Sequence, residues 1–445
     1  MKKNILFLFV ILVTSGLSAQ HTISGNFTPA KDFKWLIAYE LTAGSQRYVV
    51  DTAITEGYFT LAMPENASAG MYRLVYAVPQ DEFYIDVLYN CEEDIEFNFN
   101  LEDGAKFITS VENKTYTAYL SEITSLERQV TDFYQGGKTS KKEFTAIAQK
   151  LSEVQSKYED IGEVPLAYQC IAANEPYIPD MYEPLDTYNL NKKKNYFKVI
   201  DFKNSLLQSS GFLTEKISNY VFSPFHAALM AKLDMENAIL TNLREVSKKL
   251  LDTPDTFQTA VFHDLWKTAN TNGLFRVADT IFKDFLKPMA SQNGQQALID
   301  EIQLSSRLRM GAVSPEITWT ENGKTASLSK LSGAAQYILI FWSSTCSHCL
   351  KELPALHAEL KVYENVTILA VGLEDDQTNW EREIKNLPNF KHALAIGKWE
   401  NEYAGLFGIK QTPTYFILDR DKRFVAKPAD DKEVVSFLEE QNSKR

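Results

Sequence analysis

Cysteine is scarce in this 445-residue chain, which contains only four cysteines. Folds built from disulfides pack cysteines densely into a short chain, so this composition excludes a disulfide-built scaffold. The chain also lacks an excess of basic residues, because 46 lysines and arginines face 58 aspartates and glutamates and leave a net charge of −12. No basic stripe that would bind phosphates is visible, and nucleic acid is therefore not expected as a partner.

Long hydrophobic runs are also absent, since no stretch reaches the roughly 20 apolar residues that a membrane-spanning helix needs. The nearest candidate runs from Ile5 to Val13, follows Lys2 and Lys3, and gives way to small residues ending at Ala19. This order of charge, apolar core and small residues predicts a secretory signal peptide over residues 1–19. An uncleaved N-terminal anchor is the alternative, and in either case we expect export.

Residues 20–104 have the pattern of an all-β, sandwich-like domain. Short segments such as "WLIAYEL" and "DIEFNFN" alternate apolar with polar residues and are separated by turn residues such as Gly44 and Gly57. Four aromatic side chains either pack in the core and across strands or form a binding face, and packing is the favoured interpretation: Tyr76, Phe83, Tyr84 and Tyr89.

Residues 105–310 change to the period of helices and form a predicted central α-helical region. Apolar residues recur at helical spacing over residues 120–133 and 144–158. After a proline-rich break we expect further helices at about 200–221, 224–251, 255–269, 273–287 and 294–309. Lys192–Lys194 are predicted to lie in a solvated loop. The region has no His and Glu pair at metal-binding spacing, and it resembles a scaffold or interaction module.

Residues 311–445 alternate between strands and helices, which predicts an α/β domain. The segment "YILIFW" is apolar throughout, as expected of a strand that is buried on both faces. We expect parallel strands with helices on both faces of the sheet. The further strands are "VTILAVGL", "HALAIG", "TYFILDR" and "RFVAK", and the helices lie near 349–362, 378–386, 400–407 and 431–441.

Two of the four cysteines, Cys346 and Cys349, lie where "YILIFW" ends and the next helix begins. Residues three apart on a helix have β-carbons about 5–6 Å apart, so small adjustments would allow a disulfide. The free N–H groups and the positive dipole end of a helix start favour a thiolate, which is the nucleophilic form of cysteine. His348, between the two cysteines, would favour the thiolate further.

A zinc site and a structural disulfide both fit this cysteine pair less well. Zinc needs four ligands, yet no second CxxC follows, and His348 with His357 would complete only a partial set. We therefore expect no metal and no cofactor. A structural disulfide would close a loop of two residues and would constrain the unfolded chain very little. The sequence therefore predicts a redox-active pair.

Three segments occur in order and resemble the thioredoxin-fold domain of the TlpA/ResA type, the envelope thiol–disulfide oxidoreductases: "YILIFWSSTCSHCLKELPAL", "ILAVGLEDD" and "GIKQTPTYFILDRDKRFV". The resemblance covers about residues 310–445 and implies a thioredoxin fold over 311–445. It implies that Cys346 is the exposed attacking thiol and Cys349 the buried resolving thiol. It further implies that Pro413 is a cis-proline beside the active site.

The same resemblance assigns roles to residues around the pair. Thr412 would offer backbone pairing to a bound substrate, and Trp342 and His348 are assigned to substrate binding. Glu352 would move the proton of Cys349, with an ordinary surface glutamate as the alternative. The chain has Thr345 where the family usually has tryptophan, and no proline between the cysteines. The direction of electron flow is therefore left open, because it depends on redox potential and not on the motif alone.

The resemblance implies an exported thiol–disulfide oxidoreductase of the periplasm, in the cell envelope, that reduces disulfide-containing envelope proteins. Its other partner would be an upstream membrane electron donor or acceptor, and a membrane-peripheral location is compatible with this function. The alternative is a binding or scaffolding protein whose thioredoxin-like domain is a redox-sensing or docking module. Cys91 and Cys170 either form an interdomain disulfide or stay as free thiols, which is favoured. The oligomeric state is not predicted.

Overall fold

The computed structural model describes residues 21–162, 164–223 and 231–443, and it divides into two compact units, Met1–Met289 and Ala290–Arg445. The predicted signal peptide at residues 1–19 lies outside the described residues. In the described part of the chain, no helix has both the length and the apolar character that crossing a membrane requires.

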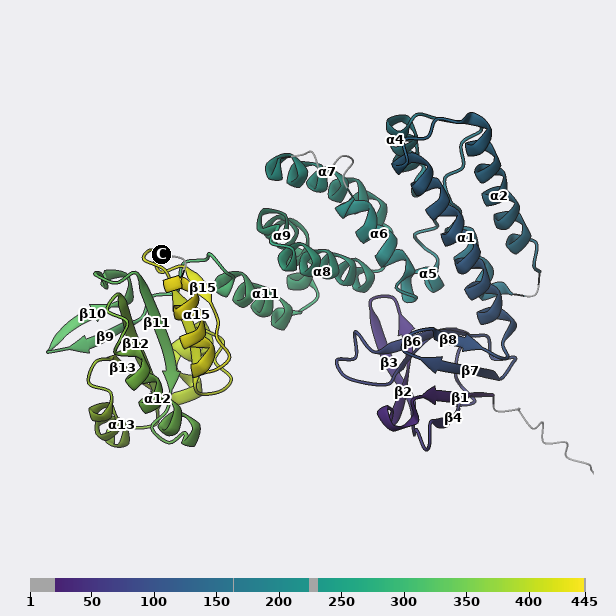
Figure 1. The fold of residues 1–445 in the computed structure, drawn as a ribbon. Helices are drawn as coiled ribbons and strands as arrows, with labels where there is room; N and C mark the ends of the chain where they lie inside the picture. Colours follow the sequence, from purple (N-terminus) through teal and green to yellow (C-terminus); the bar gives the residue numbers. More distant parts are fainter. Residues whose placement is uncertain (1–20, 163, 224–230, 444–445) are drawn as a thin grey trace, which may run out of the picture. The chain divides into compact units, whose positions relative to one another are not determined.

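Over residues 21–107 the strands form two four-stranded sheets, with strand orders β4-β1-β7-β8 and β3-β2-β5-β6 (Figure 1). Alternate residues of both sheets meet in one aromatic-rich core that includes Phe27, Leu36 and Phe97. The prediction of an all-β sandwich is therefore confirmed. The strands are β1 (Thr22–Thr28), β2 (Trp35–Thr42), β3 (Ser45–Ala53), β4 (Tyr58–Ala62), β5 (Gly70–Val75), β6 (Tyr84–Tyr89), β7 (Ile95–Asn100) and β8 (Gly104–Phe107).

The four aromatic residues of this domain mostly pack inward. Tyr76 and Tyr89 are buried in the core, and Phe83 is half-buried and packs against it. The half-buried Tyr84 ring lies 3.6 Å beneath the guanidinium of Arg73. Packing, the favoured interpretation, therefore accounts for these side chains.

The helices of the first unit follow the sandwich directly and are joined to it by hydrogen bonds. Asn113, near the start of α1, accepts a hydrogen bond from the Leu88 N–H at 2.8 Å and donates one to the Leu88 carbonyl at 2.7 Å. The helices are α1 (Val111–Gln135), α2 (Lys141–Glu159), α3 (Pro165–Ala173), α4 (Leu185–Asn195), α5 (Ser205–Ser209), α6 (Phe212–Phe222), α7 (Lys232–Leu250), α8 (Asp255–Thr271) and α9 (Phe275–Ile281).

Several helix predictions in this region need correction. The helix expected over 200–221 is interrupted at Gly211, whose φ of 72° is left-handed, and it becomes α5 and α6. The one expected over 273–287 becomes α9, a π-helical turn (Phe282–Leu286) and α10 (Lys287–Gln292). The loop predicted at Lys192–Lys194 is wrong, because these residues form the last turn of α4. Tyr188 is the only buried residue of α4, so the helix has no apolar period to detect.

The second unit is built on a five-stranded sheet with the order β13-β12-β11-β14-β15. Strands β11, β12 and β13 run parallel as predicted, but β14 and β15 pair antiparallel, so the expectation of parallel strands does not extend to them. Strand direction depends on the end of the sheet at which a connection returns, and local sequence does not reveal this. The strands are β11 (Gln336–Trp342), β12 (Val366–Glu374), β13 (Lys391–Ile396), β14 (Thr414–Leu418) and β15 (Phe424–Ala426), and a separate hairpin pairs β9 (Thr318–Glu321) with β10 (Lys324–Ser327).

Strand β11 has apolar side chains on both faces, which accounts for its uninterrupted hydrophobic sequence. Ile338, Ile340 and Trp342 face a core formed with helices α12 and α15, whereas Tyr337, Leu339 and Phe341 face a second core with α11 and α14. The prediction of helices on both faces is therefore confirmed. The helices are α11 (Gln296–Leu308), α12 (Ser347–Leu360), α13 (Thr378–Glu383), α14 (Glu402–Leu406) and α15 (Asp431–Ser443).

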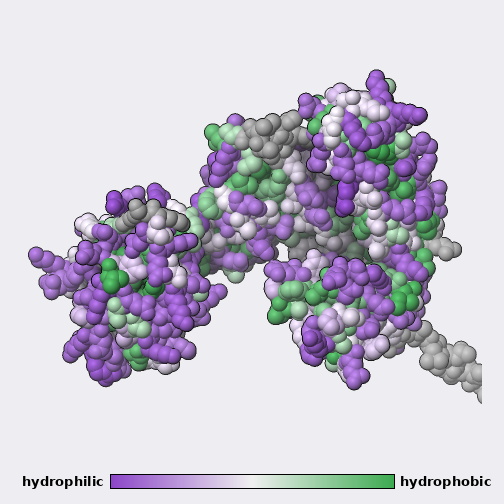
Figure 2. All heavy atoms as spheres, viewed as in Figure 1, coloured by the Kyte–Doolittle hydropathy of each residue, from purple (hydrophilic) through white to green (hydrophobic). Residues whose placement is uncertain are grey.

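Helix α11, which the sequence placed in the helical region, belongs to the second unit. Leu308 lies in the core of this unit, and the Arg307 guanidinium donates a hydrogen bond to the Leu406 carbonyl at 3.3 Å. A β-carbon added at Gly408 would lie 2.8 Å from Leu304, so the chain approaches α11 closely there. Outside these cores hydrophilic side chains cover most of the viewed face, and apolar side chains interrupt it in separate spots (Figure 2).

Candidate active site

Cys346 caps the N-terminus of α12, directly after the turn that follows β11. Its sulfur accepts a hydrogen bond from the Cys349 N–H at 3.2 Å, as a capping side chain does. Partial burial is the largest single influence and opposes ionisation of this thiol, but hydrogen bonds involving Cys349, Thr412 and His348 together lower the pKa of Cys346 below its ordinary value. Cys346 is half-buried, in contrast to the fully buried Cys349. The arrangement suits a nucleophile that ionises easily.

Cys349 lies one turn further along α12 in a different environment. It is fully buried among the side chains of one core, which includes Trp342 and Leu353. Burial, with a hydrogen bond to Cys346, raises the pKa of Cys349 to about 12. Both cysteines are free thiols in the structure. The pair therefore combines a half-buried, easily ionised thiol with a buried thiol that keeps its proton.

Thr412 and Pro413 lie directly beside the first cysteine, although they are distant in sequence. The Cys346 thiol donates to the Thr412 carbonyl at 3.3 Å, and the Thr412–Pro413 peptide bond is cis. Both residues are half-buried at the start of β14, which pairs with β11. Their predicted roles in catalysis and substrate pairing stay predictions, but the structure brings both to the site.

Glu352 follows Cys349 by three residues, so both side chains leave α12 on the same face. Its carboxylate accepts a hydrogen bond from the Tyr415 hydroxyl at 3.1 Å. Burial, together with the charge of Glu352, raises the pKa of Tyr415, whose ring packs in the same core as Cys349. Glu352 is therefore anchored beside the buried thiol rather than free in solvent.

The two remaining predicted residues lie in opposite environments. Trp342 is 1% exposed and packs in the core with Cys349, where its indole N–H has no hydrogen-bond partner in the described part of the chain. His348 is exposed on the first turn of α12, between the cysteines. Their assignments to substrate binding stay predictions.

Glu374, which the sequence did not single out, lies beneath the turn that leads to Cys346. It ends β12, is 2% exposed, and accepts hydrogen bonds from the Ser344 N–H, from the Ser344 hydroxyl at 2.9 Å and from the Ser343 hydroxyl at 3.3 Å. A buried carboxylate is costly unless it is hydrogen-bonded, and this turn supplies the donors. The detectable signal was a charged residue ending the apolar strand "VTILAVGLE".

The other reactive groups of the described chain lie apart from this site. Cys91 and Cys170 are free, half-buried and fully buried respectively, which agrees with the favoured prediction of free thiols. Over the described residues, no group of three or more His, Cys, Asp or Glu side chains is placed to hold a metal ion.

Comparison with known proteins identifies the class to which this arrangement belongs. A family model described as thioredoxin-like matches residues 335–424, which span β11 to β15 and both cysteines. The thiol–disulfide oxidoreductase ResA of Bacillus thuringiensis is 28% identical over 123 residues, which is 27% of this chain and 69% of that protein.

Among solved structures, the thioredoxin domain of a thiol–disulfide oxidoreductase from Bacteroides vulgatus is 23% identical, with a TM-score of 0.28 over 30% of this chain and 97% of that one. A thioredoxin-like protein from Bacteroides caccae covers 59% of this chain and 96% of its own length, at 17% identity and a TM-score of 0.33. Residues 335–424 thus form a thioredoxin-like domain, as the cysteine segments predict, and the similarity of this part of the chain to ResA supports the TlpA/ResA type.

Proposed function

We propose that this protein is an exported thiol–disulfide oxidoreductase that reduces disulfides of cell-envelope proteins. The observation that carries the proposal is the contrast between its two thiols: Cys346 is half-buried with a lowered pKa, and Cys349 is buried with a pKa of about 12. A nucleophile and a protected resolving thiol are what a two-step exchange requires. The sequence pattern of residues 1–19 supports export.

In the first step the Cys346 thiolate attacks one sulfur of the substrate disulfide. A mixed disulfide forms between Cys346 and the substrate, and the other substrate sulfur leaves as a thiolate that takes a proton from water. The Thr412 carbonyl, 3.3 Å from the Cys346 sulfur, lies where an extended substrate segment would pair its backbone.

In the second step Cys349 gives up its proton and attacks the Cys346 sulfur. The mixed disulfide breaks, the second substrate thiol is released, and Cys346 and Cys349 end as a disulfide, so two electrons have passed to the substrate. A thiol whose pKa is about 12 needs a base, and Glu352 is the nearest carboxylate on the same face of α12. A dithiol donor, supplied from the membrane, would then reduce the pair again.

The test measures insulin-disulfide reduction by the full chain. Cys346→Ala is expected to abolish activity, and Cys349→Ser to accumulate mixed disulfides with envelope proteins. Cys91→Ser is the matched control, because it removes a thiol outside the site and should leave the rate unchanged. Wild-type activity in Cys346→Ala would refute the mechanism. A reduction potential of about −270 mV would support a reductase, whereas one of about −120 mV would favour an oxidase.

A further inference from the structure

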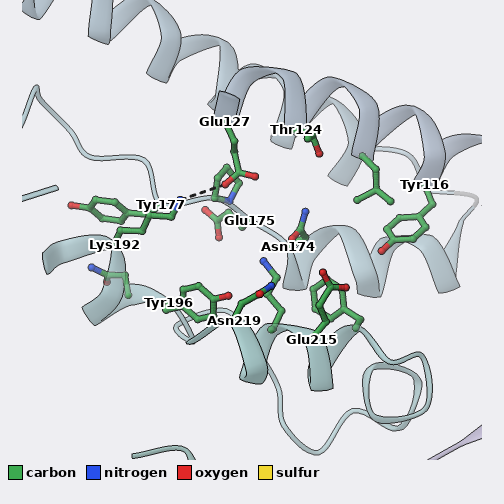
Figure 3. A pocket seen from close by; sticks show the side chains of 15 residues that line it. Tyr116, Thr124, Glu127, Asn174, Glu175, Tyr177, Lys192, Tyr196, Glu215 and Asn219 are labelled. Carbon is green, nitrogen blue, oxygen red and sulfur yellow. Dashed lines mark ion pairs between the residues drawn. The ribbon is translucent and has the colours of Figure 1, made fainter. Parts of the chain in front are cut away.

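The first unit contains a cavity of about 480 Å³ that the redox chemistry does not use. It lies between α1, the segment that follows α3, α4 and α6, and its lining is mostly polar or aromatic (Figure 3). This volume falls within the roughly 300–1,000 Å³ of sites that bind small ligands. The cavity is therefore large enough for a few amino-acid residues.

Lys216, on α6, contributes a positive charge to this cavity that no anion contacts. Its ammonium lies 5.7 Å from the Tyr196 ring and 5.5 Å from the Phe212 ring, and it forms no ion pair or hydrogen bond with any residue that the structure describes. Burial lowers the pKa of Lys216, although Glu127 and Glu215 oppose this from a distance. A desolvated ammonium without a contacting anion is costly, and an anionic ligand would remove that cost.

Two tyrosine hydroxyls supply further unused donors to the same cavity. Within the described residues, neither Tyr116 nor Tyr196 forms a hydrogen bond through its hydroxyl, and Figure 3 shows the two tyrosines lining the cavity on either side of Asn219 and Glu215. Burial raises the pKa of both, to about 12 for Tyr196, so they remain protonated donors. Three donors from two helices and one adjoining segment thus lack an acceptor.

The acidic residues of the lining limit which anion can enter. Glu127 is already paired with Lys192 at 3.7 Å, drawn as the dashed line in Figure 3, whereas Glu175 and Glu215 are exposed and have no ion pair among the described residues. A polyphosphate would meet repulsion from these carboxylates, but a single carboxylate would not carry enough charge to be excluded. The side-chain amides of Asn174 and Asn219 can pair with peptide groups.

We propose that this cavity binds a short peptide segment through one carboxylate, which takes hydrogen bonds from Lys216 and Tyr196. The Phe212 and Tyr196 rings pack against the neighbouring apolar part of the peptide, and the two asparagines hold its backbone. The carboxylate comes either from the peptide C-terminus or from an acidic side chain, since both present the same group. This binding does not depend on the cysteine pair.

The test is equilibrium dialysis of the full chain against three pools of N-acetylated tripeptides, read by mass spectrometry. One pool has free C-terminal carboxylates and no acidic side chains, the second has amidated C-termini with one Asp or Glu, and the third is amidated with Asn or Gln instead. Wild type should retain about tenfold more peptide from the first or the second pool than from the third. This is the preference expected for one charged hydrogen bond. The pool retained identifies the source of the carboxylate.

Lys216→Met should reduce retention to that of the third pool, and Lys216→Arg should keep part of it. Lys194→Met is the matched control, because it removes an exposed charge from α4 that does not line the cavity. Cys346→Ser should retain the peptides, which separates this inference from the redox proposal. If Lys216→Met does not fold, Tyr196→Phe carries the test, since it removes the hydroxyl and keeps the ring.

Equal retention of all three pools by wild type would overturn the proposal. So would wild-type retention by Lys216→Met, or by Tyr196→Phe.

Discussion

Cys346 and Cys349 occupy the same helix turn but differ in how they ionise. The first receives hydrogen bonds at the helix N-terminus, whereas the second is enclosed by core side chains. Because hydrogen bonds stabilise a thiolate and burial destabilises it, the two pKa values shift in opposite directions. The strand end and the helix start on either side of Cys346 predicted its lowered pKa, whereas the burial of Cys349 was implied by the family resemblance.

We expect Cys346 to be alkylated at lower pH than an ordinary thiol. Only the thiolate reacts, and it forms as the pH rises through the pKa, so a lowered pKa moves the rate curve to lower pH. Iodoacetamide labelling of the reduced chain, followed by peptide mass spectrometry, measures the midpoint. Cys91 is the internal control, because burial raises its pKa and its midpoint should lie higher. A Cys346 midpoint at or above that of Cys91 would contradict the expectation.

Glu374 shows where residue-level prediction failed. A carboxylate after an apolar strand is more often exposed, and nothing in the sequence indicates that Ser343 and Ser344 fold back over it. That contact depends on the pairing of Trp342 with Gly372, which places the two strand ends side by side. It is a tertiary feature, and local sequence does not encode it.

Glu374→Gln should slow alkylation of Cys346 at neutral pH several-fold. The amide keeps the size of the side chain but accepts fewer hydrogen bonds, so the turn before Cys346 is held less firmly. We also expect a loss of about 1–3 kcal/mol in the free energy of unfolding, as for other buried groups left without partners. Glu364→Gln, at an exposed position just before β12, is the control. A change in stability with unaltered Cys346 reactivity would mean that Glu374 has no positioning role.

At the scale of elements, the apolar strands and the parallel pairing of β11, β12 and β13 could be predicted, but the direction of β14 could not. "YILIFW" became the central strand β11, with Tyr337 and Ile338 beginning its two faces. The direction of β14 differs from the prediction because the chain re-enters the sheet from the other end, after α14. This antiparallel entry is what brings Thr412 next to Cys346.

Gly408→Ala should destabilise the second unit by about 1–3 kcal/mol. Gly408 has a φ of 61°, and an added β-carbon would lie 2.8 Å from the side chain of Leu304 on α11. Gly405→Ala is the matched control, because it lies in α14 with open space around its α-carbon. Urea unfolding measures both variants. Equal urea midpoints for the two variants would show that the backbone at residue 408 does not approach α11 closely.

At the scale of the whole chain, the sequence predicted the order of fold classes correctly: all-β, α-helical, then α/β. It placed α11 with the preceding helices, because a helical period reveals an apolar face and not the surface that the face covers. Leu308 instead belongs to the core formed with β11.

A fragment of residues 290–445 should fold and reduce insulin, whereas one of residues 311–445 should melt at lower temperature. The shorter fragment loses α11, and with it Leu308, which is 7% exposed, and the hydrogen bond from Arg307 to Leu406. Removing a buried leucine alone costs about 2–5 kcal/mol. Thermal unfolding by circular dichroism compares the two fragments. Identical melting temperatures would mean that α11 does not belong to the unit.

The hydrogen bond between Cys346 and Thr412 joins residues that are 66 positions apart. This hydrogen bond can form only after β14 has docked against β11. A nascent chain that ends before Thr412 therefore has a Cys346 thiol without the Thr412 carbonyl as its acceptor. The finished arrangement of the cysteine site is therefore delayed until almost the whole second unit has left the ribosome.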